Sequence, residues 1–352
     1  MSEQNARYTY LVPRDTAAFL TSGVNMSRCE NMNLILARYI PQEVIRNDTV
    51  GKYDKARDIW LKDTTRRFNT QQRRDWQALA EANFVRWQAQ TDARNILSFE
   101  GQLEDHMMVG LGGESVLENS LTLGMVNGLP FIPGSALKGI ARAYALFVIA
   151  NRIGVPVLVG DDLLNYIGNS PKSKTTPLDV LDELLALPYD TEKAQEAWQE
   201  KFNNLNDNPY QQTPVDSATI LENEDATIFK LIFGSQAKAG VCVFYDAVLS
   251  NLPDGQLFVV DVMTPHYPDY YGSDGATPPS DDQGPNPIQF MAVSRGTRFG
   301  FAIGLAQKRM RDADVAPDKL METAEKWLKR GLRDLGAGAK THAGYGLFRI
   351  LK

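Results

Sequence analysis

The chain has 352 residues, 43% of them hydrophobic and 23% charged, with a net charge of −6, which is typical of a globular protein of one large or two ordinary domains. No apolar run reaches the roughly 18 residues needed to span a bilayer, which argues against a membrane-spanning protein. The first residues also lack the basic start and apolar stretch of a signal peptide, so we expect a cytoplasmic protein with no membrane partner.

A long helical pattern over residues 53–95 dominates the N-terminal part. Its apolar side chains recur at helical spacing, and the polar residues 69–72 are expected to divide it into two helices. Residues 52–94 carry 10 basic and 6 acidic side chains, a net charge of +4. A solvated helix face is the simpler interpretation of the arginines there, and RNA contact is the alternative. We assign residues 1–95 to an N-terminal segment whose basic helical region packs on the core.

The next segment predicts a strand over residues 96–103, an Asn-Gly hairpin turn, and an apolar helix over residues 136–150. Ser135 is the expected N-cap of this helix, and Lys138 and Arg142 lie one turn apart on the same face. A helix N-terminus favours an anion, and two bases one turn in would add charge-assisted contacts. An ordinary strand-to-helix turn with two exposed bases explains the pattern equally well.

Residues 160–225 are strongly acidic, with 14 acids and 4 bases, a net charge of −10. Five prolines and a polar run leave room for two helices at most, over residues 178–187 and 192–202. We interpret the stretch as an insertion or lid outside the core. Its charge masks the basic segments, because residues 295–352 alone carry 13 bases and 6 acids, a net charge of +7.

Core-like sequence returns after the acidic stretch. Strands are expected at residues 240–249 and 257–262, and residues 288–305 indicate a hairpin that turns at residues 295–297. A loop carrying Lys238 precedes the first of these strands.

A long irregular loop, rich in proline and tyrosine, begins MTPHYPDYY and contains His266 and Tyr267. A loop of this length usually has a function. An aromatic side chain on it can stack on a splayed base, worth ~1–3 kcal/mol, but packing of the loop against the domain or a neighbour is an equal alternative.

The C-terminal region combines an amphipathic helix, a glycine-rich loop and a short strand. Pro317 opens the helix at a first-turn position. The loop reads GLRDLGAGAKTHAGYG, with Arg333, Lys340 and His342 among its charged residues. Glycine permits positive φ, and cations on such a loop favour a seat for phosphate. A nucleotide-hydrolysing P-loop is not indicated, because Ala339 separates glycine from lysine and the helix comes before the loop.

The order of strands and helices favours an α+β sandwich over a doubly wound parallel sheet. A split βαβ arrangement, with strands packed on two helices, is the most economical form of it. We therefore expect a core domain over residues 96–352, interrupted by the acidic insertion at residues 160–225.

The stretches PFIPGSALKGIAR and GAKTHAGYGLF resemble the marks of the RAMP superfamily of CRISPR-associated RNA-binding proteins. FGSQAKAGVCVFYDAVL and DVMTPHYPDYY, in the same order, extend the resemblance to the sixth Cmr subunits of type III-B CRISPR effector complexes. It runs from Val109 to the C-terminus without the acidic insertion, and it departs at Ala136, where a second serine is common. The resemblance implies a ferredoxin-like (RRM-like) core, antiviral defence, binding of the 3′ part of a guide RNA, and a capping position in a stack of related subunits.

The resemblance also carries over to individual residues. The PGSxLKGxxR segment and the glycine loop supply most of the expected RNA contacts, and the loops around Lys238 and His266 supply weaker ones. The predicted RNA-binding residues are Ser135, Lys138, Arg142, Lys238, His266, Tyr267, Arg333, Lys340, Thr341, His342, Gly344 and Gly346. The expected partners are a CRISPR guide RNA, its duplex with target RNA, and other Cmr subunits, both backbone RAMP and small subunits.

Two alternatives stay open. A metal-independent ribonuclease would need a general base, for which His342 is the candidate, although a lone loop histidine more often contacts phosphate or caps a turn. An assembly subunit with little RNA contact would turn its basic segments toward acidic neighbours. No His or Cys spacing supports a metal site, so we expect no catalytic residue, metal or cofactor.

Overall fold

The computed structural model describes residues 9–21, 31–45, 53–71, 73–92, 96–113, 117, 120–160, 162, 175–264, 287–312 and 314–351. Its helices are α1 (Arg14–Thr21), α2 (Met32–Arg38), α3 (Gln42–Ile45), α4 (Tyr53–Gln71), α5 (Arg73–Thr91), α6 (Gly134–Ile153), α8 (Pro177–Ala186), α9 (Glu192–Asn206), α10 (Ser217–Leu221), α11 (Glu224–Phe233), η2 (Gln307–Asp312), α13 (Pro317–Asp334) and η3 (Thr341–Ala343). Its strands are β1 (Ile96–Leu103), β2 (Phe131–Ile132), β3 (Cys242–Phe244), β4 (Ala247–Asn251), β5 (Phe258–Met263), β6 (Ile288–Val293), β7 (Arg298–Leu305) and β8 (Phe348–Ile350).

One antiparallel sheet, ordered β2-β4-β7-β1-β8, forms the centre of the molecule, and β3 pairs with the far end of β7. β1 and β7 pair along their whole length, with Ile96 opposite Gly304 and Gln102 opposite Arg298. α6 follows β1, and α13 lies between β7 and β8. The predicted α+β class is therefore confirmed.

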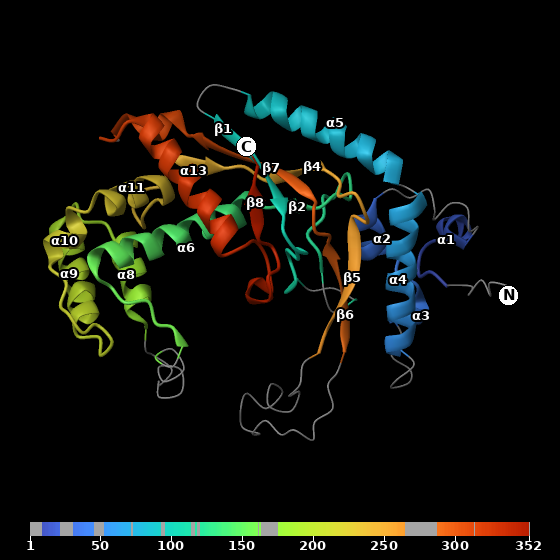
Figure 1. The fold of residues 1–352 in the computed structure, drawn as a ribbon, viewed down its shortest axis with the longest axis horizontal. Coiled ribbons are helices and arrows are strands. Elements are labelled where there is room, and N and C mark those ends of the chain that lie inside the picture. Colours follow the sequence, from blue (N-terminus) through green and yellow to red (C-terminus); the bar gives the residue numbers. More distant parts are fainter. Residues whose placement is uncertain are drawn as a thin grey trace, which may run out of the picture.

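The two faces of this sheet are covered by different helices. On one face, Phe99, Phe301 and Phe348 pack together, with ring centroids of successive pairs 5.1 and 5.3 Å apart. Lys329 of α13 lies 4.8 Å from the ring centre of Phe99, which places α13 on this face, and α6 packs beside α13 (Figure 1). On the other face α5 lies so close to β7 that a Cβ on Gly300 would meet the rings of Phe84 and Trp87, the nearer at 2.6 Å. Glycine at this position of the strand is therefore a requirement of helix packing.

The prediction of a β6–β7 hairpin was wrong. β6 pairs with β5 as a separate two-stranded ribbon, whereas β7 enters the main sheet. The turn between them is held by other partners, because the Gly296 amide donates to the Leu103 carbonyl and the Ser294 amide to the Leu257 carbonyl, both at 2.9 Å. Residues 295–297 do form the predicted turn, but these hydrogen bonds to distant segments place β6 and β7 in different sheets.

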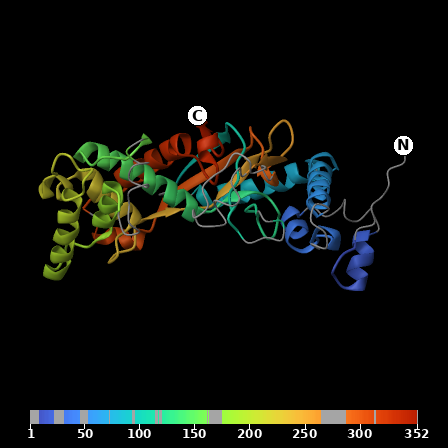
Figure 2. The same ribbon diagram turned by 90° about the horizontal axis from the view of Figure 1, so that it is seen from below.

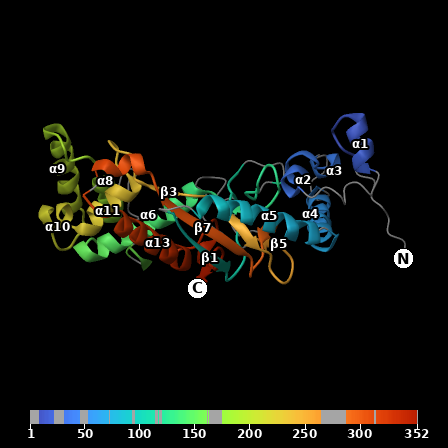
Figure 3. The ribbon, with the colours of Figure 1, turned by 90° about the horizontal axis from the view of Figure 1, so that it is seen from above.

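Helical segments extend from the sheet in opposite directions. Figure 1 shows α1–α4 at one end of the molecule and α8–α10 at the other, and the perpendicular views in Figure 2 and Figure 3 show the same elongated arrangement. The predicted division of the first long helical pattern is confirmed as α4 and α5. Asn69 fastens α4 to the ribbon, since its side chain donates to the Phe258 carbonyl at 2.8 Å and accepts from the Leu257 amide at 2.9 Å. No helix among the described residues is long and apolar enough to cross a membrane.

The described residues of the acidic stretch include the helices α8, α9 and α10, where two helices at most were predicted. α8, α9 and α10 bury a set of large apolar side chains, including Leu181, Leu184, Trp198, Leu205 and Ile220. α8 also packs on α6 and α11. In α8 and α9 the acidic residues are interspersed with the buried apolar ones, as in amphipathic helices. The number of prolines therefore underestimated how much of the acidic stretch is helical.

Candidate nucleic-acid interface

The first turn of α6 differs from the prediction. The helix begins at Gly134 with Pro133 as its N-cap, so Ser135 is inside the helix, exposed, and is not the cap. The Gly134 amide donates to the Asp246 carboxylate at 2.7 Å. A Cβ on Gly134 would lie 2.1 Å from the Phe244 carbonyl oxygen, so the β3–β4 link closes directly over the helix end. An internal carboxylate therefore already occupies part of the anion seat predicted at this helix.

The two bases on α6 that were predicted to bind RNA, Lys138 and Arg142, face other helices rather than open solvent. Arg142 forms an ion pair with Asp182 of α8 at 2.7 Å, each side chain being about one third exposed, and its guanidinium lies 5.2 Å from the ring centre of Phe229 on α11. Lys138 is half-buried; burial, then the charges of Arg142 and Arg309, lower the pKa of its ammonium group. Arg142 thus connects the acidic helices to the core, and Lys138 belongs to a cationic group with Arg309.

The glycine loop is a closed, ordered structure. Its backbone bonds to itself and to the segment after β1, because the Ala337 amide donates to the Gly346 carbonyl at 2.8 Å and the Ala339 amide to the Met108 carbonyl at 2.8 Å. The Gly346 amide donates to the His106 carbonyl at 2.7 Å. The loop therefore keeps a fixed shape beside residues 106–108.

Glycine is required at several of its positions for two reasons. Four of its glycines have positive φ, namely Gly336, Gly338, Gly344 and Gly346. A Cβ on Gly346 would lie 2.0 Å from the Ala337 carbonyl oxygen, and one on Gly338 would lie 2.3 Å from the Met108 carbonyl oxygen. Gly344 differs, because its nearest neighbour would be Asp105 at 3.7 Å, so only its φ of 92° disfavours a side chain.

Lys340 lies inside this loop rather than on its outer surface. It is half-buried with φ 62°, and its Nζ lies 4.5 Å from the ring centre of Phe290 and 5.9 Å from that of Tyr345. The Tyr345 hydroxyl donates to the Asp261 carboxylate. Burial would raise the pKa of Asp261, but hydrogen bonds from Tyr345 and the Val262 amide, with cationic groups nearby, lower it. The side chain of Lys340 therefore joins the glycine loop to the β5–β6 ribbon.

The outer surface of the loop presents His342 and backbone amides. His342 is exposed, and within the described part of the chain the amides of Thr341 and His342 have no hydrogen-bond acceptor. Lys340 has left-handed backbone angles and the following residues form η3, a backbone arrangement in which adjacent N–H groups can point toward one anion. The outward-facing donors of the loop are thus these two amides, beside exposed His342.

The structure divides the predicted residues into two groups. α6 crosses α13 where Gly331 approaches Ile140, so the first turn of α6 and the start of the glycine loop lie at the same end of the helix layer (Figure 1). Ser135 belongs at that end with the loop. Lys138, Arg142 and Lys238 face α8, α11 and η2 instead. Arg333 is exposed and bonds to Asp334 at 2.6 Å.

The remaining predicted residues lie on other loops. Lys238 is exposed on a closed turn in which the Ser235 amide donates to the Lys238 carbonyl at 2.8 Å. His266 and Tyr267 lie outside the described residues. Within the described part, no group of three or more His, Cys, Asp or Glu side chains is placed to hold a metal ion.

Sequence reasoning did not single out Asp246, Lys230 or Arg309. Asp246 accepts a hydrogen bond from the first turn of α6, 112 residues away. Arg309 lies beside the loop before β3, since the Ala306 amide donates to the Val241 carbonyl at 2.8 Å and the Arg309 guanidinium donates to the Gly240 carbonyl at 2.9 Å. No local pattern marks such residues. The only available signal was the clustering of bases between residues 295 and 352.

A model of the RAMP superfamily matches residues 102–349, the part of the chain that contains α6, α13, the glycine loop and the main sheet except for most of β1. The chain belongs to the RAMP superfamily. It is also similar to the CRISPR system Cmr subunit Cmr6 of Pyrococcus furiosus, with 32% identity over 249 residues, which are 69% of this chain and 64% of that protein. The chain thus spans a little under two thirds of this relative's length.

Two solved structures are similar at a lower level. The cryo-EM structure of the type III-B Cmr-beta bound to cognate target RNA matches with a TM-score of 0.48 and 17% identity, over 87% of this chain and 76% of that chain. The crystal structure of Cmr6 from Pyrococcus furiosus matches with a TM-score of 0.37 and 26% identity, over 73% and 98% respectively. Since both TM-scores are below 0.5, the assignment of this RAMP protein to its family depends on the sequence matches.

Proposed function

We propose that this RAMP protein is a non-catalytic, guide-RNA-binding subunit of a type III-B Cmr antiviral effector complex, holding the 3′ part of the guide and capping the subunit stack. Its similarity to Cmr6 supports the assembly, and its glycine loop supports the RNA contact. The observation that carries the RNA contact is that the amides of Thr341 and His342, on a hydrogen-bonded loop beside the exposed His342 side chain, have no acceptor among the described residues. Such donors suit phosphate oxygens and discriminate little between bases.

The strand order supports a ferredoxin-like core within this proposal. Taken as β1, α6, β3 with β4, β7, α13 and β8, the elements run βαββαβ and the sheet order is β8-β1-β7-β4. Both helices then cover one face of the sheet, as in a split βαβ fold. On this proposal the glycine loop follows the second helix and leads into the last strand.

The direct test is RNA binding by the full chain at several salt concentrations. We expect His342→Ala to weaken binding of a labelled guide RNA because it removes the exposed side chain beside the outer amides, and Lys340→Ala to weaken it because the loop loses its contact with Phe290. Because neither variant removes a lysine or arginine side chain from the outer surface of the loop, the slope of log K against log salt should stay close to that of the parent protein. Lys193→Ala, an exposed lysine on α9, is the matched control and should bind as the parent protein does. Parent-like affinity in both loop variants would refute the assignment of the loop.

The same preparation separates the alternatives. A ribonuclease would cleave the guide at defined positions, and His342→Ala would abolish cleavage. Within the described residues no side chain orients the His342 imidazole, whereas a general base is usually held by a third group. An assembly subunit with little RNA contact would copurify with other Cmr subunits but bind guide RNA no better than an unrelated acidic protein does.

A further inference from the structure

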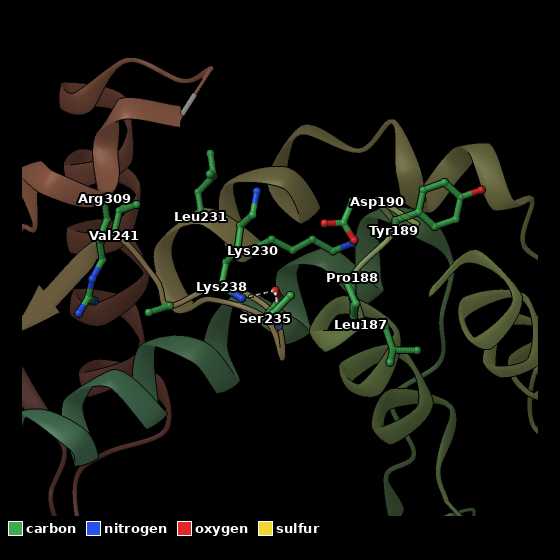
Figure 4. A pocket seen from close by; sticks show the side chains of 12 residues that line it. Leu187, Pro188, Tyr189, Asp190, Lys230, Leu231, Ser235, Lys238, Val241 and Arg309 are labelled. Carbon is green, nitrogen blue, oxygen red and sulfur yellow. Dashed lines mark hydrogen bonds between the residues drawn. The ribbon is translucent and has the colours of Figure 1, made fainter. Parts of the chain in front are cut away.

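A cavity of about 570 Å³ lies between α11, the loop from α11 to β3, and the segment that joins α8 to α9. Figure 4 shows Arg309 at one end of it and Tyr189 at the other, with Lys230, Lys238 and Asp190 between them. The volume is within the range of small-molecule sites, about 300–1,000 Å³. Residues 187–190 of the acidic stretch form part of its wall, so this stretch contributes directly to the cavity.

The cavity carries an excess of positive charge. Lys230, Lys238 and Arg309 come from three different elements, and Asp190 is the one carboxylate among the described residues that line it. Lys230 is half-buried with no ion pair to a described residue, and burial lowers the pKa of its ammonium group. Lys138 adds a fourth cation near Arg309. Arg309 donates to the Gly240 carbonyl at 2.9 Å, but no described carboxylate forms an ion pair with it, with Lys230 or with Lys238. Cations without an ion-pair partner at a partly buried site favour an anionic ligand.

The rest of the lining is apolar. Leu187 and Pro188 on one side, and Leu231 and Val241 on the other, supply walls without hydrogen-bonding side chains. The ligand must therefore combine a compact anionic group with a flat or apolar body. A nucleoside phosphate has this combination, with the phosphate as the anionic group and the nucleobase as the flat body. The hydroxyls of its ribose could donate hydrogen bonds to the Asp190 carboxylate.

We propose that this cavity binds a single nucleoside phosphate, with the phosphate on Lys230, Lys238 and Arg309, the base against the apolar walls, and the ribose at Asp190. An acidic peptide is a poorer fit, because the turn that carries Lys238 is closed by its own hydrogen bonds to Ser235 and offers no strand edge. The site is separate from the glycine loop, so the inference goes beyond the proposed function. The nucleotide would be either free or part of a bound RNA.

The test is calorimetric titration of the full-length protein with AMP, adenosine and inorganic phosphate. AMP should bind at least tenfold more tightly than either fragment. Arg309→Gln and Lys230→Met should each weaken AMP binding about tenfold or more, the effect expected for losing a charge-assisted hydrogen bond. Lys308→Gln is the matched control, since Lys308 is exposed next to Arg309 but does not line the cavity. AMP binding no tighter than phosphate, or unchanged in Arg309→Gln, would overturn the proposal.

Further arms identify the source of the nucleotide. Displacement of AMP by a short single-stranded RNA would place a nucleotide of bound RNA in the cavity, and AMP binding unaffected by RNA would indicate a free nucleotide; both outcomes support the proposal. Binding of a glutamate-rich peptide in place of AMP would contradict it. Lys340→Ala should retain AMP affinity, so a failure of the glycine-loop assignment and a failure of the cavity assignment give different results.

Discussion

The glycine loop and the cavity beside Arg309 are both cationic, but they present different chemical groups. In the loop, the ammonium group of Lys340 is directed inward over Phe290 and Tyr345, and the outward donors are backbone amides with His342. In the cavity, the donors are the side chains of Lys230, Lys238 and Arg309. A count of bases treats these regions alike, whereas burial and hydrogen bonding show that one depends on backbone shape and the other on side-chain charge.

The largest expected effect comes from changing the backbone shape of the loop. Gly346→Ala should lower the free energy of unfolding by ~3 kcal/mol or more, because its Cβ would lie 2.0 Å from the Ala337 carbonyl oxygen at a φ of 69°. Urea or thermal unfolding measures the change. Gly139→Ala on α6, with nothing within 4 Å of its Cβ, should instead stabilise by roughly 0.5–1 kcal/mol. Equal stability of the two variants would show that the loop is not held in this shape.

A smaller loss of stability is expected from changing Arg142, which was predicted to contact RNA but forms an ion pair with Asp182. Arg142→Gln should destabilise the protein by about 2 kcal/mol, since it removes the ion pair to Asp182 and the contact over Phe229. Proteolysis between α8 and α9 should become faster, and Asp182→Asn should have a similar effect. Guide-RNA affinity should hardly change. Weaker RNA binding by Arg142→Gln at unchanged stability would contradict this structural role and indicate that Arg142 contacts RNA.

Removing the hydrogen bond between the glycine loop and the β5–β6 ribbon should cause the smallest loss of stability. Tyr345→Phe removes the hydrogen bond to Asp261, at a cost of about 1 kcal/mol near neutral pH. The folded protein lowers the pKa of Asp261, so this contribution is present above the unfolded pKa of the carboxyl group and is lost as the pH falls through the folded value. The stability difference between parent and variant should therefore shrink in acid, which unfolding curves at pH 7 and below pH ~3 would measure.

Local patterns predicted elements better than they predicted partners. The strand at residues 96–103 and the helix opened by Pro317 appear as expected, because alternation and first-turn proline are local signals. The Asp246 cap on Gly134 and the separation of β6 from β7 depend on bonds between distant segments. The glycine loop was found from composition alone, but its inward lysine and outward amides depend on contacts with residues 106–108 and 290.

Crosslinking of labelled guide RNA to the full chain, followed by mapping of the attached peptides, tests the RNA-binding claim most directly. The account predicts attachment within residues 335–347, around His342, and at the first turn of α6 near Ser135, with attachment at the loop reduced in His342→Ala. The exposed arginines of α4 and α5, such as Arg67 and Arg74, offer the competing surface. Crosslinks confined to those helices, with none in the glycine loop, would contradict the account.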